Sequence, residues 1–565
     1  MASNTTTALA GPLDTLNTTA NVTTASTSPL AFLQDLDFVV LELKLVVSAL
    51  GIIYLGSHAA IRRPPSATPP KKKHPGQKSD DDDRFSQGLE PTDAIMFPVM
   101  AGIVLVGLYY LIQWLKDPAI LNKILRYYMT AASMASILTL YAHGMDLVTS
   151  FVFPSYWRGR NRSLRRVDQR RKTVQVCDDF GNAGAVTEKN PLPGILSVFS
   201  VTERAQKAVW ELRGLLTRHW TIKLFIHGVG EEAAKIRFSH MMALFLSLAT
   251  ALVYFSTNSI FLSNMLGYGM CYGSFLILSP TDFLTGSLVL WGLFFYDVVM
   301  VFYTPYMITV ATTLEVPIKL TFEVASRKSI LGLGDIVIPG MVIAWALRLD
   351  LWLHYVRKIK YEPTDLTIVT KDDSSGEIVR HSETKHKEVK AHYVDVKNKW
   401  GEGLWTRENF FLSTPSELPV ELAGARFPKT YFYASMVGYT LGMAVTLTML
   451  LVFKHGQPAL LYLVPGVLGS MVITALARGE WKDMCKYTED GSLDTVDVVV
   501  DLDGEGNAIT TIGLLEDGIV DTTKDKKGDE CEKKVAEASS KEGAAKTGHK
   551  VFLLSIEAPP EDEEE

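Results

Sequence analysis

The chain has 565 residues, of which 47% are hydrophobic, and its formal net charge is -6. The net charge says little about partners because it averages a basic middle and an acidic tail, and the mean hydropathy of +0.13 is diluted by charged stretches. The four cysteines lie far apart, without a CxxC pair or a histidine cluster at metal-ligand spacing, which argues against a disulfide scaffold and a zinc site. We expect neither a metal nor another cofactor.

Nine stretches are long and apolar enough to cross a hydrocarbon layer, which takes about 20 residues of helix. The sequence therefore predicts an all-α polytopic membrane protein with nine transmembrane helices. The predicted spans are residues 39–61, 93–115, 127–151, 239–257, 259–279, 283–304, 329–348, 431–453 and 457–477.

The first predicted span carries Glu42, Lys44 and His58, which we expect to snorkel or to lie near its ends. A cleaved signal peptide is the alternative interpretation of this region. The first 38 residues contain no Lys or Arg, so the positively charged segment that opens a signal peptide is missing. A permanent first span is therefore favoured.

Basic residues predict the orientation, because cytosolic loops carry an excess of Lys and Arg. Such residues follow span one, and eight more lie in the run Arg158–Lys172 after span three. Both loops are expected in the cytosol, which places the N-terminus in the lumen and, after nine spans, the C-terminus in the cytosol. The lumenal segment then carries three glycosylation sequons, at Asn4, Asn17 and Asn21.

The spans divide the chain into seven segments. These are a lumenal Ser/Thr-rich segment (1–38), spans one to three with a basic, Pro-rich loop (39–151), a basic cytosolic loop (152–238), spans four to seven (239–348), a charged cytosolic insertion (349–430), spans eight and nine (431–477) and an acidic cytosolic tail (478–565).

The segments outside the membrane are interpreted as linkers or regulatory elements. Residues 64–92 are rich in Pro and charge and indicate a solvated tether. The charged insertion is compatible with a small β element. The tail alternates apolar and polar residues at 496–502 and then turns Lys/Glu-rich, which favours disorder. The run Arg158–Lys172 is interpreted as a loop beside the anionic cytosolic leaflet, not as a nucleic-acid site.

Two aspartates, Asp297 and Asp335, each lie inside a long apolar run. A carboxylate at membrane depth costs at least about 2.5 kcal/mol, so two of them on neighbouring spans need a reason. Two carboxyl groups brought face to face can share one proton, so that one acts as acid and the other as base. A lone buried aspartate would more often be an interhelical hydrogen-bond partner or a proton relay.

Small residues and a proline accompany the two aspartates. Gly332 and Gly334 remove side-chain bulk before Asp335 and permit unusual backbone angles, so another backbone could approach the carboxyl. Irregular backbone at membrane depth needs a protein cover or a wet cavity. At the start of span nine, Pro458 leaves a neighbouring carbonyl free and Ala459 allows close helix packing.

The pair Tyr296–Asp297, the string GLGDIVIPG at 332–340 and the triplet Pro458–Leu460 resemble the YD, GxGD and PAL motifs of the presenilin-type intramembrane aspartyl proteases. With its lumenal N-terminus, opposite to the presenilins, the chain looks most like the signal peptide peptidases within that family. The resemblance implies a presenilin-like fold.

The resemblance also implies roles for single residues. Asp297 and Asp335 would be the catalytic pair that activates a water molecule. Tyr296 would orient Asp297, and Gly332 and Gly334 would give the pair room. Leu333 would touch the substrate. The substrate cleft would be shaped by Pro458, Ala459 and Leu460.

The implied partners are transmembrane-helix substrates, namely remnant signal peptides and type II membrane proteins, together with membrane lipid. A nucleic acid is not expected, and a homo-oligomer is left open. These substrates suggest the endoplasmic reticulum membrane. The chain ends in Glu563–Glu565 rather than a dibasic retrieval signal, so a later secretory compartment is also left open.

Two other classes of protein remain as alternatives. A proton-coupled transporter also uses intramembrane carboxylates but should show an internal repeat, and spans six and seven have no counterpart among spans one to four. A catalytically silent scaffold that binds membrane proteins would be expected to lose one aspartate, and both are present.

Overall fold

The computed structural model describes most of the chain in segments. These are residues 36–68, 87–115, 118–159, 163–177, 183–188, 190–226, 230–314, 316–324, 327–371, 378–397, 399–406, 422, 424, 426–453, 456–493, 498–502, 508–516, 519–521 and 552–557. The predicted glycosylation sites Asn4, Asn17 and Asn21 lie outside the described residues.

Within this described part, eight helices are long and apolar enough to cross a membrane, which confirms a polytopic all-α membrane protein. They are α1 (Leu36–Ala59), α2 (Asp93–Leu115), α5 (Phe238–Thr257), α6 (Ile260–Ile277), α7 (Phe283–Phe302), α9 (Gly334–Val356), α12 (Thr430–Phe453) and α13 (Leu460–Arg478).

The remaining predicted span, 127–151, falls inside the 35-residue helix α3 (Pro118–Val152), which is not one of these eight. Its length suffices, but Ser, Thr and the polar residues His143 and Asp146 dilute its apolar composition. The prediction of nine apolar spans is therefore met by eight such helices and one longer, less apolar helix that packs beside α5 and α6.

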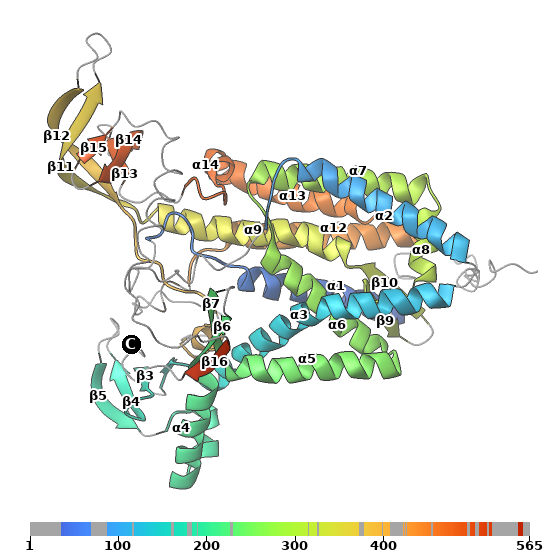
Figure 1. The fold of residues 1–565 in the computed structure, drawn as a ribbon, viewed down its shortest axis with the longest axis horizontal. Coiled ribbons are helices and arrows are strands. Elements are labelled where there is room, and N and C mark those ends of the chain that lie inside the picture. The colour runs from blue at the N-terminus through green and yellow to red at the C-terminus, as the bar shows by residue number, and fades with distance from the viewer. Residues whose placement is uncertain are drawn as a thin grey trace, which may run out of the picture.

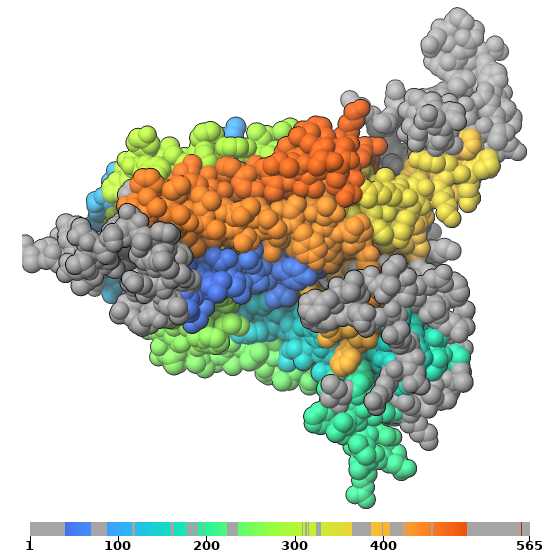
Figure 2. Space-filling model, turned by 180° about the vertical axis from the view of Figure 1, so that it is seen from behind, coloured from blue at the N-terminus to red at the C-terminus, as the bar shows by residue number. Residues whose placement is uncertain are grey.

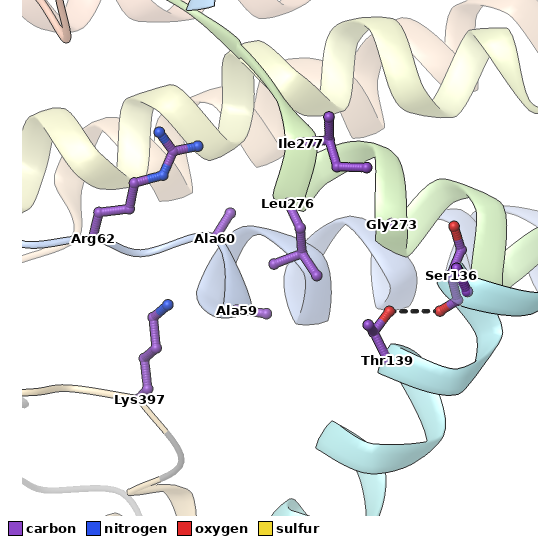
Figure 3. A pocket seen from close by; sticks show the side chains of 10 residues that line it. Ala59, Ala60, Arg62, Ser136, Thr139, Gly273, Leu276, Ile277 and Lys397 are labelled. Atoms are coloured by element: carbon purple, nitrogen blue, oxygen red, sulfur yellow. Dashed lines mark hydrogen bonds between the residues drawn. The ribbon is translucent and has the colours of Figure 1, made fainter. Parts of the chain in front are cut away.

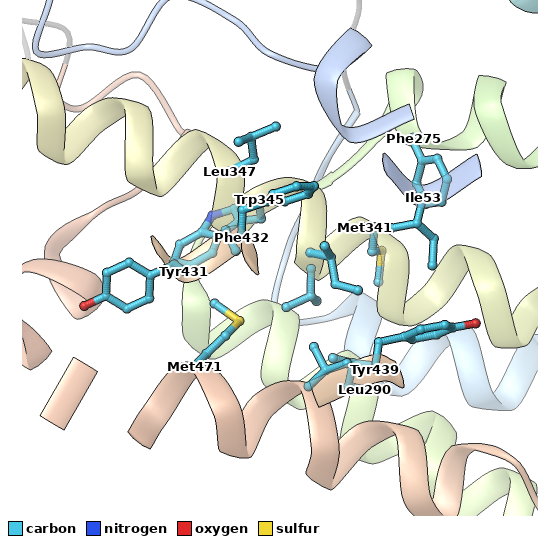
Figure 4. Packing of buried hydrophobic residues seen from close by; sticks show 14 of the residues in the cluster. Ile53, Phe275, Leu290, Met341, Trp345, Leu347, Tyr431, Phe432, Tyr439 and Met471 are labelled. Atoms are coloured by element: carbon cyan, nitrogen blue, oxygen red, sulfur yellow. The ribbon is translucent and has the colours of Figure 1, made fainter. Parts of the chain in front are cut away.

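Helix α9 is the centre of the bundle, with the other long helices around it (Figure 1). Of its most apolar stretch 89% is buried, against 0% for α2 at the periphery. Side chains from several helices converge on α9, among them Phe275, Leu290, Phe432 and Met471, which pack near its Met341 and Trp345 (Figure 4). A helix covered on all sides has to be apolar all round, as α9 is.

Helix α9 also runs further than the predicted span 329–348, because the two charged residues near its end are buried with partners. Arg348 Nε donates to Glu489 Oε1 at 2.6 Å. Asp350 accepts the backbone N–H groups of Tyr431 and Phe432 at 3.1 and 2.9 Å, which satisfies the open start of α12. At its other end, residues predicted as helix instead form a β-strand.

Glu42 and His58 lie towards the two ends of α1, as expected for polar residues of span one, but both are buried and do not reach solvent. Glu42 is 6% exposed and its carboxyl is hydrogen-bonded to Ser329, while His58 is 8% exposed and accepts a hydrogen bond from Lys429 Nζ at 2.9 Å. Only Lys44 is exposed. Hydrogen bonds to polar groups of distant segments offset the cost of burying these two side chains. In Figure 2, α1 forms a strip between the α12–α13 pair and helices α3 and α5.

Helices α12 and α13 touch backbone to backbone through glycines. A Cβ at Gly466 would lie 2.5 Å from the carbonyl oxygen of Gly438, and a Cβ at Gly442 would lie 2.8 Å from that of Tyr462. Such small residues allow two membrane helices to approach closely.

The segments outside the bundle are folded where they are described, contrary to their interpretation as linkers, and they gather at one end of it (Figure 1). The basic loop forms an antiparallel sheet of β2 (Tyr156–Arg158), β3 (Leu164–Asp168), β4 (Thr173–Cys177) and β5 (Ala183–Glu188), then the 3-10 helix Gly194–Ser200 and helix α4 (Glu203–Thr217). A second sheet joins β6 (His219–Ile226) and β7 (Gly230–Arg237) to β16 (Phe552–Glu557) from the tail.

The insertion and the tail build one closed barrel together. Its strands are β11 (Lys360–Lys371), β12 (Ile378–Val389), β13 (Val498–Leu502), β14 (Ala508–Glu516) and β15 (Ile519–Asp521). The β element predicted in the insertion is confirmed, and the predicted disorder of the tail is wrong for these strands and for α14 (Trp481–Lys486). Strands of the insertion pair with strands of the tail, a contact that neither segment's sequence reveals alone.

Short elements complete the fold. Strand β1 (Gln87–Leu89) pairs in parallel with β8 (Leu278–Pro280), and Thr68 bridges to His392, so both described ends of the predicted tether 64–92 are docked. Helix α8 (Tyr306–Thr313) follows α7, and α10 (Trp400–Trp405) lies against α3. The hairpin of β9 (Lys319–Val324) and β10 (Arg327–Gly332) lies among the helices, in contact with α1 and α6.

Candidate active site

Asp297 lies near the end of α7 and is 4% exposed. Its Oδ2 accepts the backbone N–H of Leu460 at 3.1 Å. Leu460 is the first residue of α13, and the first N–H groups of a helix have no partner within it. The helix N-terminus also carries partial positive charge. The Pro458–Leu460 triplet thus presents a helix start to the carboxyl group, a contact that the sequence analysis did not predict.

Asp335 lies in the first turn of α9 and is partly exposed. The β9–β10 hairpin leads directly into this turn, which is tied down by the Leu333 N–H donating to the Ile318 carbonyl at 3.1 Å. Asp335 lies within electrostatic range of Asp297. The two intramembrane carboxyl groups that the sequence singled out therefore lie within electrostatic range of each other on neighbouring helices.

The glycines before Asp335 leave space without unusual backbone angles. Neither Gly332 nor Gly334 is among the described residues with positive φ, so the left-handed conformation that glycine permits is not used here. A Cβ on Gly332 would lie 3.4 Å from Asp335 Oδ2, and one on Gly334 would lie 3.8 Å from Ile338 Cδ1. Both are ordinary contact distances. The space beside the carboxyl comes from the missing side chain alone.

Leu333 and Tyr296 lie close to the pair but face neighbouring helices. Leu333 is 8% exposed, and its methyl groups lie against Gly267 of α6. The ring of Tyr296 lies beside Gly102 of α2. Among the hydrogen bonds of the described residues, none joins Tyr296 to Asp297, so its predicted orienting role has no direct contact here.

Sequence reasoning missed Tyr439, which belongs to this site. Tyr439 is 0% exposed on α12, and its hydroxyl donates to the Asp335 backbone carbonyl at 3.3 Å. A tyrosine inside an apolar span must find a partner for its hydroxyl, and that requirement was the available signal. Asp350 was missed as well, although its carboxylate is buried on the same helix as Asp335.

A comparison with protein families decides where the chain belongs. The family model described as signal peptide peptidase matches residues 80–491, which include both aspartates and the Pro458–Leu460 triplet. The chain belongs to the signal peptide peptidase family. The matched residues take in the basic loop and the charged insertion as well as the apolar helices.

Individual relatives are similar over 262 to 435 residues. A probable intramembrane protease of Saccharomyces cerevisiae is 26% identical over 435 residues, 72% of this chain and 62% of the relative. One of Schizosaccharomyces pombe is 31% identical over 262 residues, 45% of this chain and 67% of the relative. The signal peptide peptidase of Homo sapiens is 29% identical over 294 residues, 50% of this chain and 59% of the relative. The chain thus spans about three fifths of the budding-yeast and human relatives.

Proposed function

We propose that this protein is an intramembrane aspartyl protease that hydrolyses peptide bonds within transmembrane segments. The observation that carries the proposal is the meeting of Asp297 and Asp335 inside the helix bundle, with the Leu460 N–H donating to Asp297. A purely structural aspartate would be satisfied by its own partners, as Asp350 is by two N–H groups. Among the hydrogen bonds of the described residues, none reaches the Asp335 carboxyl, and Asp297 lies within electrostatic range of it.

In the proposed mechanism the two carboxyl groups hold one proton between them. The carboxylate of Asp297, which keeps its hydrogen bond from Leu460, takes a proton from a water molecule as the water oxygen attacks the peptide carbonyl. Asp335 gives its proton to the carbonyl oxygen. Collapse of the tetrahedral intermediate breaks the C–N bond, and the amine leaves with a proton returned from the pair.

The proposed substrates are remnant signal peptides and type II membrane spans, whose helices must unwind before hydrolysis. The β9–β10 hairpin supports this, because β10 runs directly into the turn that holds Asp335. A two-stranded sheet leaves strand edges open, and an extended peptide can add to such an edge. Ile330 on β10 is 54% exposed and offers an apolar contact there.

The remaining site residues would act by position. Tyr439 would fix the backbone of Asp335 through its carbonyl, while Gly332 and Gly334 would keep the space beside the carboxyl open. Pro458, Ala459 and Leu460 would hold the start of α13 at Asp297. Leu333 and Tyr296 would support the pair through packing, since both lie against other helices.

We propose an orientation with the N-terminus in the lumen and the C-terminus in the cytosol, in the endoplasmic reticulum membrane. The folded sheets and the basic loop lie at the same end of the bundle (Figure 1), which supports a single cytosolic face.

Binding of a transition-state isostere tests the protease against the transporter and scaffold alternatives. A peptide with a hydroxyl-bearing tetrahedral carbon in place of the scissile bond should bind the purified wild type at least about a hundredfold more tightly than the parent peptide. Asp335→Ala should lose this preference and Asp350→Asn should keep it. Equal affinity of wild type and Asp335→Ala would favour a scaffold or a transporter.

A further inference from the structure

A cleft away from the aspartates opens between α1 and α3, both of which pack against α6. It consists of two adjoining hollows of about 300 and 230 Å³ that share Ala59 and Lys397 in their lining (Figure 3). The larger hollow alone reaches the lower limit of small-molecule sites, about 300 Å³. Neither contains Asp297 or Asp335, so the cleft is separate from the proposed active site.

The walls of the larger hollow are mostly small and apolar, whereas the smaller hollow is also lined by His58, His143 and Tyr272. Helix α6 packs so tightly on α3 that a Cβ at Gly273 would overlap Ser136, and one at Gly269 would lie 2.9 Å from Ile137. On the side of α1 the lining residues are short, which leaves the hollow open. The main lining residues of the larger hollow are Ala59, Ala60, Ala135, Thr139, Gly273 and Leu276.

Two cations, Arg62 and Lys397, line one end of this apolar space (Figure 3). Three carboxylates near these cations already have partners. Asp395 accepts the backbone N–H of Lys397 at 3.0 Å. Glu489, which also interacts with Arg62, is bound to Arg348 at 2.6 Å, and Asp146 is bound to Arg237 at 3.1 Å. The cleft therefore combines an apolar body with a positive end.

The charged insertion supplies half of the positive end. Trp400 of α10 packs its ring against His58 at 4.9 Å and Tyr54 at 5.5 Å, between ring centroids, and so fixes the insertion to α1. Lys397, three residues earlier, is held over the opening of both hollows. The insertion thus contributes to the lining of both hollows and is not only a connection between α9 and α12.

We propose that the cleft binds an anionic glycerophospholipid of the cytosolic leaflet, with an acyl chain between α1 and α3 and the phosphate-bearing headgroup at Arg62 and Lys397. The apolar walls match a hydrocarbon chain. The cations match a headgroup with net negative charge, and basic pockets between membrane helices on the cytosolic side are suited to such lipids. The site would make the docking of the insertion depend on lipid composition.

Photo-crosslinking of the full chain tests this proposal. The probe is phosphatidylserine with a diazirine in its acyl chain, diluted into phosphatidylcholine vesicles, and the labelled peptides are mapped by mass. Labels should concentrate on residues 55–60, 135–147 and 272–277. Lys397→Gln should lower labelling about fivefold, the ratio equivalent to about 1 kcal/mol for one basic residue near an anionic leaflet.

Filling the cleft gives a second, independent variant. Ala135→Leu should abolish labelling of these three segments, whereas Ala444→Leu, on an exposed face of α12, and Arg171→Gln, at an exposed cytosolic position, should leave it unchanged. If Ala135→Leu does not fold, Lys397→Gln decides. Equal labelling by a phosphatidylcholine probe, labels spread over all lipid-facing helices, or full competition by a free fatty acid would overturn the proposal.

Discussion

Replacing Gly466 by alanine should separate α12 from α13 and so disturb both carboxyl groups of the proposed active site. The new Cβ would lie 2.5 Å from the Gly438 carbonyl oxygen, about 1 Å inside a normal non-bonded separation. Because the obstacle is backbone, no side chain can turn away to relieve it. Overpacking of this kind costs about 1–3 kcal/mol. The displaced helices carry Tyr439 and Leu460, which contact Asp335 and Asp297.

Gly469 provides a matched control one turn further along α13, since a Cβ there would meet nothing within 4 Å. Gly469→Ala should be neutral or stabilise by up to about 1 kcal/mol, because alanine favours the helix. Thermal unfolding in one detergent should give a lower Tm for Gly466→Ala only, together with reduced cleavage of a model substrate. Equal Tm values for the two variants would refute the reasoning from close backbone contact.

Two further predictions concern the charged residues at the end of α9. Asp350→Ala should lower the free energy of unfolding by about 2 kcal/mol, because two N–H groups at the start of α12 lose their acceptor. Asp350→Asn should lower it by less. Thermal unfolding of both variants measures the difference. Arg348→Met should cost about 3–5 kcal/mol by leaving Glu489 buried without its ion-pair partner. Burial raises the pKa of Glu489, but the charges of Arg348 and Arg62 and the hydrogen bond from Ser279 outweigh it and hold the pKa below the ordinary value of 4.5. The stabilisation that ionised Glu489 contributes is therefore present above pH 4.5 and is lost as the pH falls through the lowered pKa. In Arg348→Met, acid unfolding should begin at a higher pH than in the wild type. An unchanged midpoint of acid unfolding would contradict this.

The sequence was sufficient where a single segment carries the signal. Long apolar runs located the helices, and the cost of burying Asp297 and Asp335 identified the two carboxyl groups. It was insufficient where two distant segments satisfy each other. The donor to Asp297 is a backbone N–H of Leu460, which has no sequence signature, and Asp350 is tolerated in α9 only because α12 begins beside it. The barrel strands likewise come from the insertion and the tail, and the sequence of the insertion did not indicate that it pairs with strands of the tail.

The most direct test of the catalytic pair is cleavage of a signal-peptide-like helix by the purified chain in detergent, with products mapped by mass. Wild type should cut inside the apolar segment. Asp297→Asn and Asp335→Asn keep the shape of the side chain but remove its ionisation, and each should reduce the rate at least about a hundredfold. Asp350 is 4% exposed, as Asp297 is, and lies on the same helix as Asp335, so Asp350→Asn should keep the activity if it folds. Retention of more than a few per cent of activity in either of the first two variants would contradict the account.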